Sequence, residues 1–382
     1  MKRDAPRDSP PAEPVRGRGT AENPADRFTE LLVERDPELP PEAPPTTVYL
    51  DASRTILSRN DSPDIPFEWS ANPYRGCEHG CVYCYARPTH EYLGLSAGLD
   101  FETKLFAKPD APKLLREAFA KPSWKPQVIA FSGVTDCYQP VERTLRIMRG
   151  CLEVMSETRH PTGIITKSAL VTRDVDLLQP LADAHAVLVC VTITTLDDEL
   201  AAVLEPRAAR PAKRLETIAA LASAGIPVAV MVAPLIPGLT DHEIPAILGA
   251  AAERGATRAG WQLLRLPGAV LDLFDAWLAR WRPERREKVL HRIRDLHGGS
   301  LTDSRFGVRM RGEGEWAKQL ADLFRISATK AGLKHRRYEL DASSFVRPAR
   351  KRGSVRQLEL GFTADPARAR AEAPRRGDAG AA

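Results

Sequence analysis

Three cysteines gathered in one short stretch are the residues of this chain best suited to chemistry. Cys77, Cys81 and Cys84 are separated by three and then by two residues, a spacing typical of metal ligands. Thiolates on one loop can hold three corners of an iron–sulfur cube, and such clusters are normally held by four cysteines. No fourth cysteine lies nearby in the sequence. The fourth iron would therefore be open to a ligand that is not protein, as in catalytic rather than structural zinc sites.

The same cysteines allow a second interpretation, a zinc site completed by a histidine. His79 or His90 would supply the fourth ligand of a Cys3His set, which suits zinc. Zinc knuckles usually carry their cysteines in C-x2-C pairs, however, and here one such pair stands with a single extra cysteine. A disulfide is disfavoured because the cysteines are too close in sequence for easy pairing and nothing marks the chain as secreted.

The cysteine stretch, with Tyr83 just before the last cysteine, resembles the signature of the radical S-adenosylmethionine (SAM) superfamily. The resemblance implies a 4Fe-4S cluster whose open iron binds the amino and carboxylate groups of SAM. It also implies an electron donor such as flavodoxin or ferredoxin. The electron would cleave SAM reductively and give a 5′-deoxyadenosyl radical, which abstracts hydrogen from the substrate.

Composition sets wide limits on partners and location. The chain has 382 residues, 43% of them apolar, a formal net charge of +5 and a pI of about 8.9. This mild excess of positive charge permits a nucleic-acid partner without requiring one. The N-terminus leads into proline and charge instead of an apolar signal, and no apolar run reaches the length of a membrane span. We therefore expect a cytoplasmic protein without a membrane partner, in a compartment where thiols stay reduced.

From Phe67 onward, apolar runs of strand length alternate with amphipathic segments of helix length. Six strands are predicted at 67–72, 128–131, 162–166, 187–193, 228–232 and 261–264. The helices between them are expected near 111–119, at 143–158, from 174, at 211–224 and at 241–254. This alternation predicts an α/β fold with parallel strands and helical crossovers. Six units leave a barrel open, and the resemblance likewise implies a partial (β/α)6 TIM-type barrel with its site at the C-terminal strand ends.

The predicted organisation along the chain has five parts. They are a disordered N-terminal tail (1–45), an N-terminal arm with an edge strand at 47–50 (46–66), the radical SAM core (67–270), a helical C-terminal extension (271–345) and a basic disordered tail (346–382). Helices are expected at 269–296 and 316–330. The tails are rich in proline and charge and cannot bury enough apolar surface to offset the entropy of ordering.

Small and polar residues follow the second predicted strand. Ser132, Gly133 and Thr135 would let the backbone approach a ligand closely, and Asp136 can accept a hydrogen bond from an ammonium group. The resemblance implies that this strand end contacts the SAM amino group, although the family's usual Gly-Gly-Glu pattern is absent. The alternative is an ordinary turn in which Asp136 caps a helix.

Later strand ends supply further candidates for cofactor binding. Lys167 follows the third strand and can pair with a carboxylate. Thr192 and Thr194, near the end of the fourth, are candidates for a ribose hydroxyl. Glu205 and Arg207 flank a proline on the following loop and are well placed to reach inward, with a surface ion pair as the alternative.

Several residues resemble one branch of the superfamily, the spore photoproduct lyase-like proteins, which reverse a thymine dimer in DNA. Matching positions hold Tyr83, Tyr85, Thr135–Asp136 and Thr166–Lys167. Gly133 stands where those lyases carry the cysteine that returns a hydrogen atom to the product. Cys137 lies close by in a different register and is the candidate hydrogen donor. A lyase reaction therefore does not carry over from the sequence alone.

The sequence leaves the substrate open. Arg305, Arg309 and Arg311, with Phe306, can contact a nucleic-acid backbone or simply form a solvated surface. Residues 357–362 resemble the peptide by which repair proteins dock on the sliding clamp, and an apolar peptide in a tail can fold on binding. DNA is the leading substrate, a radical SAM maturase or RNA-modifying enzyme is the alternative, and a zinc-stapled nucleic-acid-binding protein is the non-enzyme alternative.

Overall fold

The computed structural model describes residues 15–28, 45–335 and 339–349. The peptide Gln357–Phe362, expected to dock on a sliding clamp, lies outside the described residues. In the part of the chain that is described, no helix has both the length and the apolar character needed to cross a membrane.

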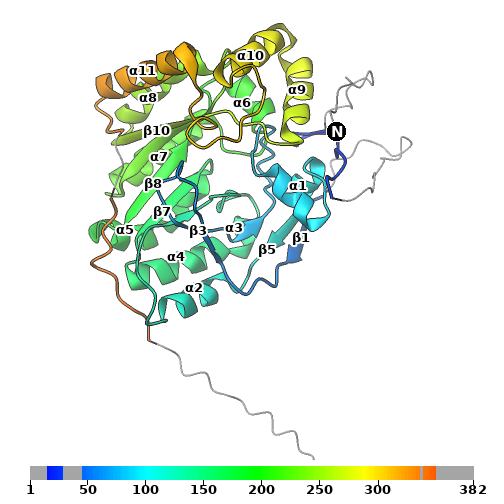
Figure 1. Ribbon diagram of the computed structural model, residues 1–382. Helices are drawn as coiled ribbons and strands as arrows, with labels where there is room; N and C mark the ends of the chain where they lie inside the picture. The colour runs from blue at the N-terminus through cyan, green and yellow to red at the C-terminus, as the bar shows by residue number, and fades with distance from the viewer. Residues whose placement is uncertain (1–14, 29–44, 336–338, 350–382) are drawn as a thin grey trace, which may run out of the picture. The chain divides into compact units, whose positions relative to one another are not determined.

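A seven-stranded sheet forms the centre of the fold (Figure 1). In spatial order its strands are β10 (Arg258–Leu263), β9 (Val228–Leu235), β8 (Val187–Thr192), β7 (Thr162–Thr166), β6 (Ile129–Phe131), β3 (Trp69–Ala71) and β2 (Leu57–Arg59). Neighbours from β10 to β3 pair in parallel, and β2 pairs with β3 in the antiparallel sense. No pairing among the described residues joins β10 to β2. The six parallel strands therefore form the open, partial barrel that the sequence predicts.

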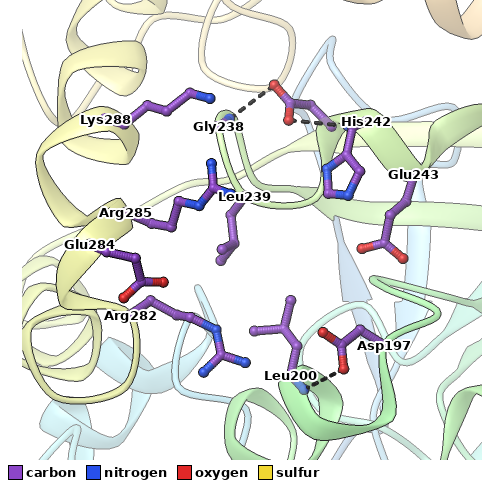
Figure 2. Close-up of a pocket in the computed structure, with 11 residues that line it drawn as sticks. Asp197, Leu200, Gly238, Leu239, His242, Glu243, Arg282, Glu284, Arg285 and Lys288 are labelled. Atoms are coloured by element: carbon purple, nitrogen blue, oxygen red, sulfur yellow. Dashed lines mark hydrogen bonds between the residues drawn. The ribbon is translucent and has the colours of Figure 1, made fainter.

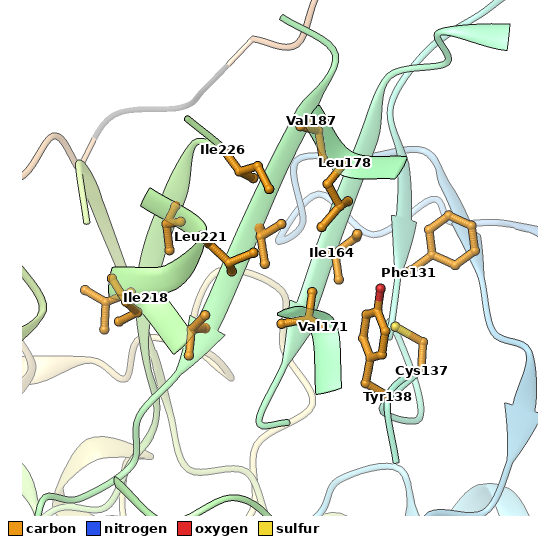
Figure 3. Packing of buried hydrophobic residues seen from close by; sticks show 14 of the residues in the cluster. Phe131, Cys137, Tyr138, Ile164, Val171, Leu178, Val187, Ile218, Leu221 and Ile226 are labelled. Atoms are coloured by element: carbon orange, nitrogen blue, oxygen red, sulfur yellow. The ribbon is translucent and has the colours of Figure 1, made fainter. Parts of the chain in front are cut away.

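Helices connect the parallel strands and cover the sheet. They are α2 (Ala111–Phe119), α3 (Glu142–Leu145), α4 (Ile147–Thr158), α5 (Val175–Asp183), α6 (Asp198–Leu204), α7 (Pro211–Ser223) and α8 (Ile244–Glu253), with short 3-10 turns η2 (Ala169–Asp174) and η3 (Asp241–Glu243). The apolar stripe of α4 buries Met148, Leu152 and Met155 against the sheet. A large cluster of buried side chains fills the space between sheet and helices (Figure 3).

Two segments predicted as single helices are each divided in two. The segment 143–158 is interrupted at Arg146, whose φ of 52° lies in the left-handed region. The Glu142 carboxylate accepts from the backbone N–H groups of Met148 (3.0 Å) and Arg149 (3.2 Å), and so satisfies the first turn of α4. The segment 269–296 is divided into α9 (Val270–Trp281) and α10 (Pro283–Leu296) because proline begins a helix more readily than it continues one.

A second, smaller sheet lies beside the barrel and contains β1 (Thr47–Leu50), β5 (Lys104–Ala107) and β4 (Tyr74–Arg75), in that order. β1 pairs with β5 in parallel, and β4 pairs with it in the antiparallel sense. The segments η1 (Arg87–Leu93) and α1 (Leu99–Thr103) precede β5 in the chain. The sequence predicts β1 but not the sheet to which it belongs.

The C-terminal extension links the two edges of the open barrel. Leu263 at the end of β10 donates its backbone N–H to the Met310 carbonyl (3.0 Å). Asp64, in the loop between β2 and β3, accepts from Gly307 N–H (2.6 Å) and pairs with Arg309 (2.5 Å). We call these contacts of Asp64 the edge clasp. Burial opposes ionisation of Asp64, but Gly307 and Arg309 keep its pKa below the usual range. The extension ends in α11 (Gly314–Lys330), which contacts α8.

Candidate functional site

The cysteine loop lies between β4 and η1, and only the short strand β4 separates it from β3, the first parallel strand of the barrel. Cys77 and Cys81 are buried and Cys84 is half-buried. Backbone bonds fix the loop, from Cys77 N–H to the Phe101 carbonyl (2.9 Å) and from Cys84 N–H to the Cys81 carbonyl (3.2 Å). Burial raises the pKa of the Cys77 thiol, and the nearby Asp136, Cys81 and Cys84 raise it further. The half-buried Cys84 packs against both the buried cluster that contains Cys77 and the one that contains Cys81.

A buried ion pair supports the loop from behind. Arg87 and Glu102 are both completely buried and lie 2.6 Å apart. The guanidinium of Arg87 also donates to the carbonyls of Cys81 (3.0 Å) and Gly98 (3.0 Å). Burying two charges is tolerated only when further hydrogen bonds satisfy them, as they do here. In the sequence, both residues look like ordinary surface charges.

The N-terminal segment 15–28 packs onto this support, contrary to the disordered tail predicted over 1–45. Gly19 donates its N–H to the Glu102 carboxylate (2.9 Å), and Thr20 donates its hydroxyl to the same group (3.2 Å). A side chain on Gly19 would overlap the Gly80 carbonyl, because its Cβ would lie 1.6 Å from that oxygen. A glycine is therefore required where the segment crosses the cysteine loop.

Polar residues missed from the sequence tie the loop to its neighbours. Glu78 donates its backbone N–H to the Gln139 side chain (2.9 Å), and Gln139 is fully buried. The Glu78 carboxylate accepts from the Thr46 hydroxyl (2.8 Å) and pairs with Arg207 (3.1 Å). Arg207 thus contacts the cysteine loop through Glu78, and its predicted role in cofactor binding stays a prediction. In the sequence Gln139 is marked only by its place before Pro140, and its burial is seen only in the structure.

Asp136, after β6, joins the cysteine loop to the next strand end. Its carboxylate accepts from the Thr166 hydroxyl (2.8 Å), from Lys167 N–H (2.8 Å) and from Tyr138 N–H (2.9 Å). The His79 ring lies 3.4 Å from it. Burial lowers the pKa of His79, although Asp136 opposes the effect. Both oxygens of Asp136 are therefore engaged within the protein.

The other residues after β6 have structural contacts. Ser132 accepts from Cys137 N–H (2.9 Å), and Thr135 donates its hydroxyl to the Tyr74 carbonyl (2.8 Å). The Gly133 carbonyl accepts from the Tyr85 hydroxyl (2.7 Å), and Tyr85 is 41% exposed.

Cys137, the predicted hydrogen donor, is fully buried in the main core beside Tyr138 (Figure 3). Burial raises the pKa of its thiol well above the ordinary value. This placement argues against a hydrogen-donor role, because a thiol enclosed by core side chains cannot meet a substrate.

A buried network behind Tyr83 includes three of the predicted site residues. The Glu205 carboxylate accepts from the hydroxyls of Tyr83 and Thr194 and from the Arg214 guanidinium. Arg214 also donates to the Thr192 carbonyl (3.0 Å) at the end of β8. Burial raises the pKa of Glu205, but Arg214, Lys167 and the hydrogen bonds outweigh it and hold the pKa at about 2. Glu205 is thus charged and positions Tyr83.

Lys167 is the predicted site residue with an ammonium group still available to a ligand. It follows β7 and lies 5.7 Å from the centre of the Tyr83 ring. Within the described ranges its ammonium group makes no hydrogen bond or ion pair with the protein. A half-buried cation in this position, beside the cysteine loop, suits a carboxylate ligand.

The donors present fit an iron–sulfur cluster. Soft thiolate ligands on one loop suit such clusters, and the three thiols share the loop with no fourth cysteine close in sequence. In the described ranges no group of three or more His, Cys, Asp or Glu side chains, the three cysteines included, is arranged to hold a metal ion. The histidines of the zinc interpretation have other contacts, His79 with Asp136 and His90 with the Lys104 carbonyl (2.8 Å).

Comparisons with known proteins show the family of the chain. Residues 71–251 match the family model of the radical SAM superfamily. An uncharacterised protein of Mycobacterium tuberculosis is 37% identical over 235 residues, which are 61% of this chain and 68% of that protein. The chain belongs to the radical SAM superfamily. As a radical SAM enzyme it is expected to use SAM and an iron–sulfur cluster.

More distant relatives share the same region or the fold. An uncharacterised protein of Methanocaldococcus jannaschii is 30% identical over 172 residues, covering 45% of this chain and 62% of that protein. A mutant of spore photoproduct lyase superposes with a TM-score of 0.55 at 16% identity, covering 75% of this chain and 81% of that one. At this identity the likeness shows that the two radical SAM proteins share a fold.

A pocket of about 550 Å³ lies between the N-terminus of α10 and the loops after β8 and β9 (Figure 2). Two of its lining residues, Leu200 and Leu239, belong to the buried cluster that contains Cys81. Arg282, Arg285 and Lys288 form one side, and Asp197 and Glu243 are among the acids on the other. Glu243 accepts from Thr195 (2.7 Å), and Asp197 caps α6. The lining therefore carries both signs of charge.

The basic residues proposed to contact nucleic acid are mostly engaged within the protein. Arg305 pairs with Asp303 (2.7 Å) and with Glu313 (2.7 Å). Arg309 belongs to the edge clasp and lies over the Phe306 ring. Arg311 lies over the Trp261 ring at 4.5 Å. A nucleic-acid backbone would have to compete with these partners.

Proposed function

We propose that Cys77, Cys81 and Cys84 hold a 4Fe-4S cluster whose open iron binds SAM. When bound, the cluster supplies the electron that cleaves SAM reductively and yields a 5′-deoxyadenosyl radical. The observation that supports the proposal most is the cysteine trio on the loop after the first parallel strand, held by the Arg87–Glu102 pair. The chain's own residues then position the cofactor and exclude water.

Residues around the cysteine loop have different roles in positioning the cofactor and the substrate. Lys167 would pair with the SAM carboxylate, because its ammonium group has no protein partner among the described residues. Tyr83, whose hydroxyl donates to Glu205, packs beside the cysteines. Tyr85, which is 41% exposed, donates its hydroxyl to the Gly133 carbonyl and would present an aromatic face to a substrate.

For the substrate, we propose a nucleic acid, with lyase-like repair of damaged DNA as the leading reaction. The solved relatives of similar fold include a spore photoproduct lyase with AdoMet and dinucleoside spore photoproduct bound. Here Gly133 replaces the hydrogen-returning cysteine expected for that branch, and Cys137 does not substitute for it. The alternatives remain a radical SAM maturase or RNA modifier and, outside enzymes, a zinc-stapled nucleic-acid-binding protein.

Anaerobic reconstitution tests the proposal. The expected result is a brown protein with iron and sulfide in equal amounts, which releases 5′-deoxyadenosine from SAM after reduction. Deuterium transferred from a labelled oligonucleotide into 5′-deoxyadenosine would identify the substrate. A colourless protein that carries one zinc ion would refute the cluster and support the zinc alternative.

A further inference from the structure

The two tyrosines that flank Cys84 each carry a cation against their ring. The Lys167 ammonium lies 5.7 Å from the centre of the Tyr83 ring, and the guanidinium of Arg265 lies 5.5 Å from the centre of the Tyr85 ring. A cation over an aromatic face is attracted to it. Among the described residues, neither cation makes a hydrogen bond or an ion pair with a protein acceptor. Two positive charges beside the cysteine loop are therefore available to ligands.

The position of Arg265 is fixed by the residues on either side of it. Arg265 follows β10 and is half-buried. Leu264 and Leu266 are both buried in the cluster that contains Cys81. Leu264 also donates its backbone N–H to the carbonyl of Leu235, the last residue of β9 (3.0 Å). The backbone of Arg265 is therefore held beside the cysteine loop, just beyond the C-terminal end of a parallel strand.

Arg265 is not paired with the acid whose charge reaches it. That acid is Asp64, and its carboxylate is bonded to Gly307 and Arg309 in the edge clasp. Burial lowers the pKa of Arg265, and the positive charge of Arg309 lowers it further. A guanidinium carries five N–H donors, and partial burial removes part of the water that would satisfy them. An anionic ligand at Arg265 would satisfy these donors and offset the charge.

SAM has too few anionic groups to occupy both cations. It carries one carboxylate, which is proposed above to pair with Lys167. The other charged groups of SAM are its ammonium and its sulfonium, and both are repelled by a guanidinium. Arg265 is therefore available to a second anion, which the substrate would supply.

Exposed aromatic rings accompany this cation. Tyr85 is 41% exposed, and its hydroxyl is donated to the Gly133 carbonyl (2.7 Å). Phe306 is 56% exposed and lies against Arg309, whose charge reaches Arg265. Nucleic-acid bases stack on such rings, while guanidinium groups bind the phosphates between the bases. The rings beside an available guanidinium favour a nucleic-acid strand over an acidic peptide, because Asp and Glu side chains have no ring to stack.

We propose that Arg265 binds a backbone phosphate of an unpaired nucleic-acid strand and so positions a base beside the exposed ring of Tyr85. The inference rests on the proposed function, to which it adds the residue that anchors the substrate. An unpaired strand is required because an enzyme that acts on a base must take that base out of the stack. Arg265 acts by binding and orienting the strand, and no bond or proton moves at its side chain.

The test measures the affinity of the full chain, reconstituted anaerobically, for a fluorescein-labelled single-stranded oligonucleotide by fluorescence anisotropy over a range of salt concentrations. Arg265→Gln is the variant, and it leaves no acceptor of the described residues unpaired. Arg254→Gln is the matched control, because Arg254 is exposed in the turn before β10, at the opposite end of that strand. Urea unfolding of each protein shows that it folds, and calorimetry gives its affinity for SAM.

We expect Arg265→Gln to weaken strand binding about tenfold and to lower the slope of log affinity against log salt by about one, the effect of one lost phosphate contact. Its SAM affinity should be unchanged, and Arg254→Gln should match wild type throughout. Arg265→Lys, which keeps the charge, should keep the salt slope. A strand affinity and salt slope equal to wild type in Arg265→Gln would overturn the proposal, as would an equal loss of SAM affinity.

Two further probes test the class of ligand. With a duplex of the same sequence, wild type and Arg265→Gln should bind equally, and the same tenfold difference would contradict the requirement for an unpaired strand. An acidic peptide of the same charge should not displace the labelled strand, and displacement as effective as by the unlabelled strand would overturn the choice of nucleic acid. Failure of the proposed function is distinguishable, because release of 5′-deoxyadenosine from SAM is measured without any strand, whereas strand binding is also measured on the cluster-free protein.

Discussion

The buried Arg87–Glu102 pair allows a sharp test of how the cysteine loop is held. In Glu102→Gln the side chain keeps its size but loses its charge and one of its two acceptor oxygens. Glu102 now accepts from Arg87, Thr20 and Gly19, so the amide nitrogen of Gln would face at least one of these donors. Removing one partner of a buried pair costs about 3–5 kcal/mol, because the other charge stays buried and uncompensated.

Urea denaturation of the anaerobic, cluster-free protein measures this cost as a change in the free energy of unfolding. The control is Glu216→Gln, which removes an exposed partner of Lys213 and should leave the unfolding free energy unchanged. Glu102→Gln should also take up less iron on reconstitution, because the Cys81 carbonyl depends on Arg87. A variant as stable as wild type, with full iron content, would refute the reasoning.

Three further predictions address the site and the core. Cys84→Ala should lose its iron on reconstitution while Cys151→Ala, a core cysteine, retains it, as measured by iron and sulfide analysis. Lys167→Met should weaken SAM binding at least tenfold in calorimetry, or by about 1.4 kcal/mol, and unchanged affinity would exclude the carboxylate contact. Burial holds the pKa of His160 at about 4, so the unfolded state binds its proton first as the pH falls. The unfolding free energy should therefore decrease between about pH 6.5 and pH 4, by about 2 kcal/mol at pH 5, and less steeply in His160→Gln.

The parts of the fold that depend on local pattern could be predicted from the sequence. Six apolar runs separated by amphipathic segments give the parallel strands, because both patterns are set by neighbouring residues. The helix break at Pro283 follows from proline itself. The break at Arg146 does not, because a left-handed arginine is sustained by Glu142 through bonds to the next turn.

The part of the site that could be predicted is the part that residue spacing reveals. Three cysteines at fixed separations indicate their own role, whereas Arg87 and Glu102 look like ordinary surface charges until the fold buries them. Candidate residues after the strands lie near the loop, but most of them bind other protein groups. Glu205 supports Tyr83 and Asp136 joins two strand ends, so proximity alone did not reveal their roles.

The edge clasp differs in kind from the contacts between the strands of the barrel. Neighbouring strands are joined by ladders of backbone hydrogen bonds, whereas in the edge clasp the Asp64 carboxylate bonds to Gly307 and Arg309. Protonation of Asp64 in acid removes its pairing with Arg309, whereas the backbone ladder contains no titrating group. The two edges of the open barrel are therefore joined, at this place, by a contact that depends on pH.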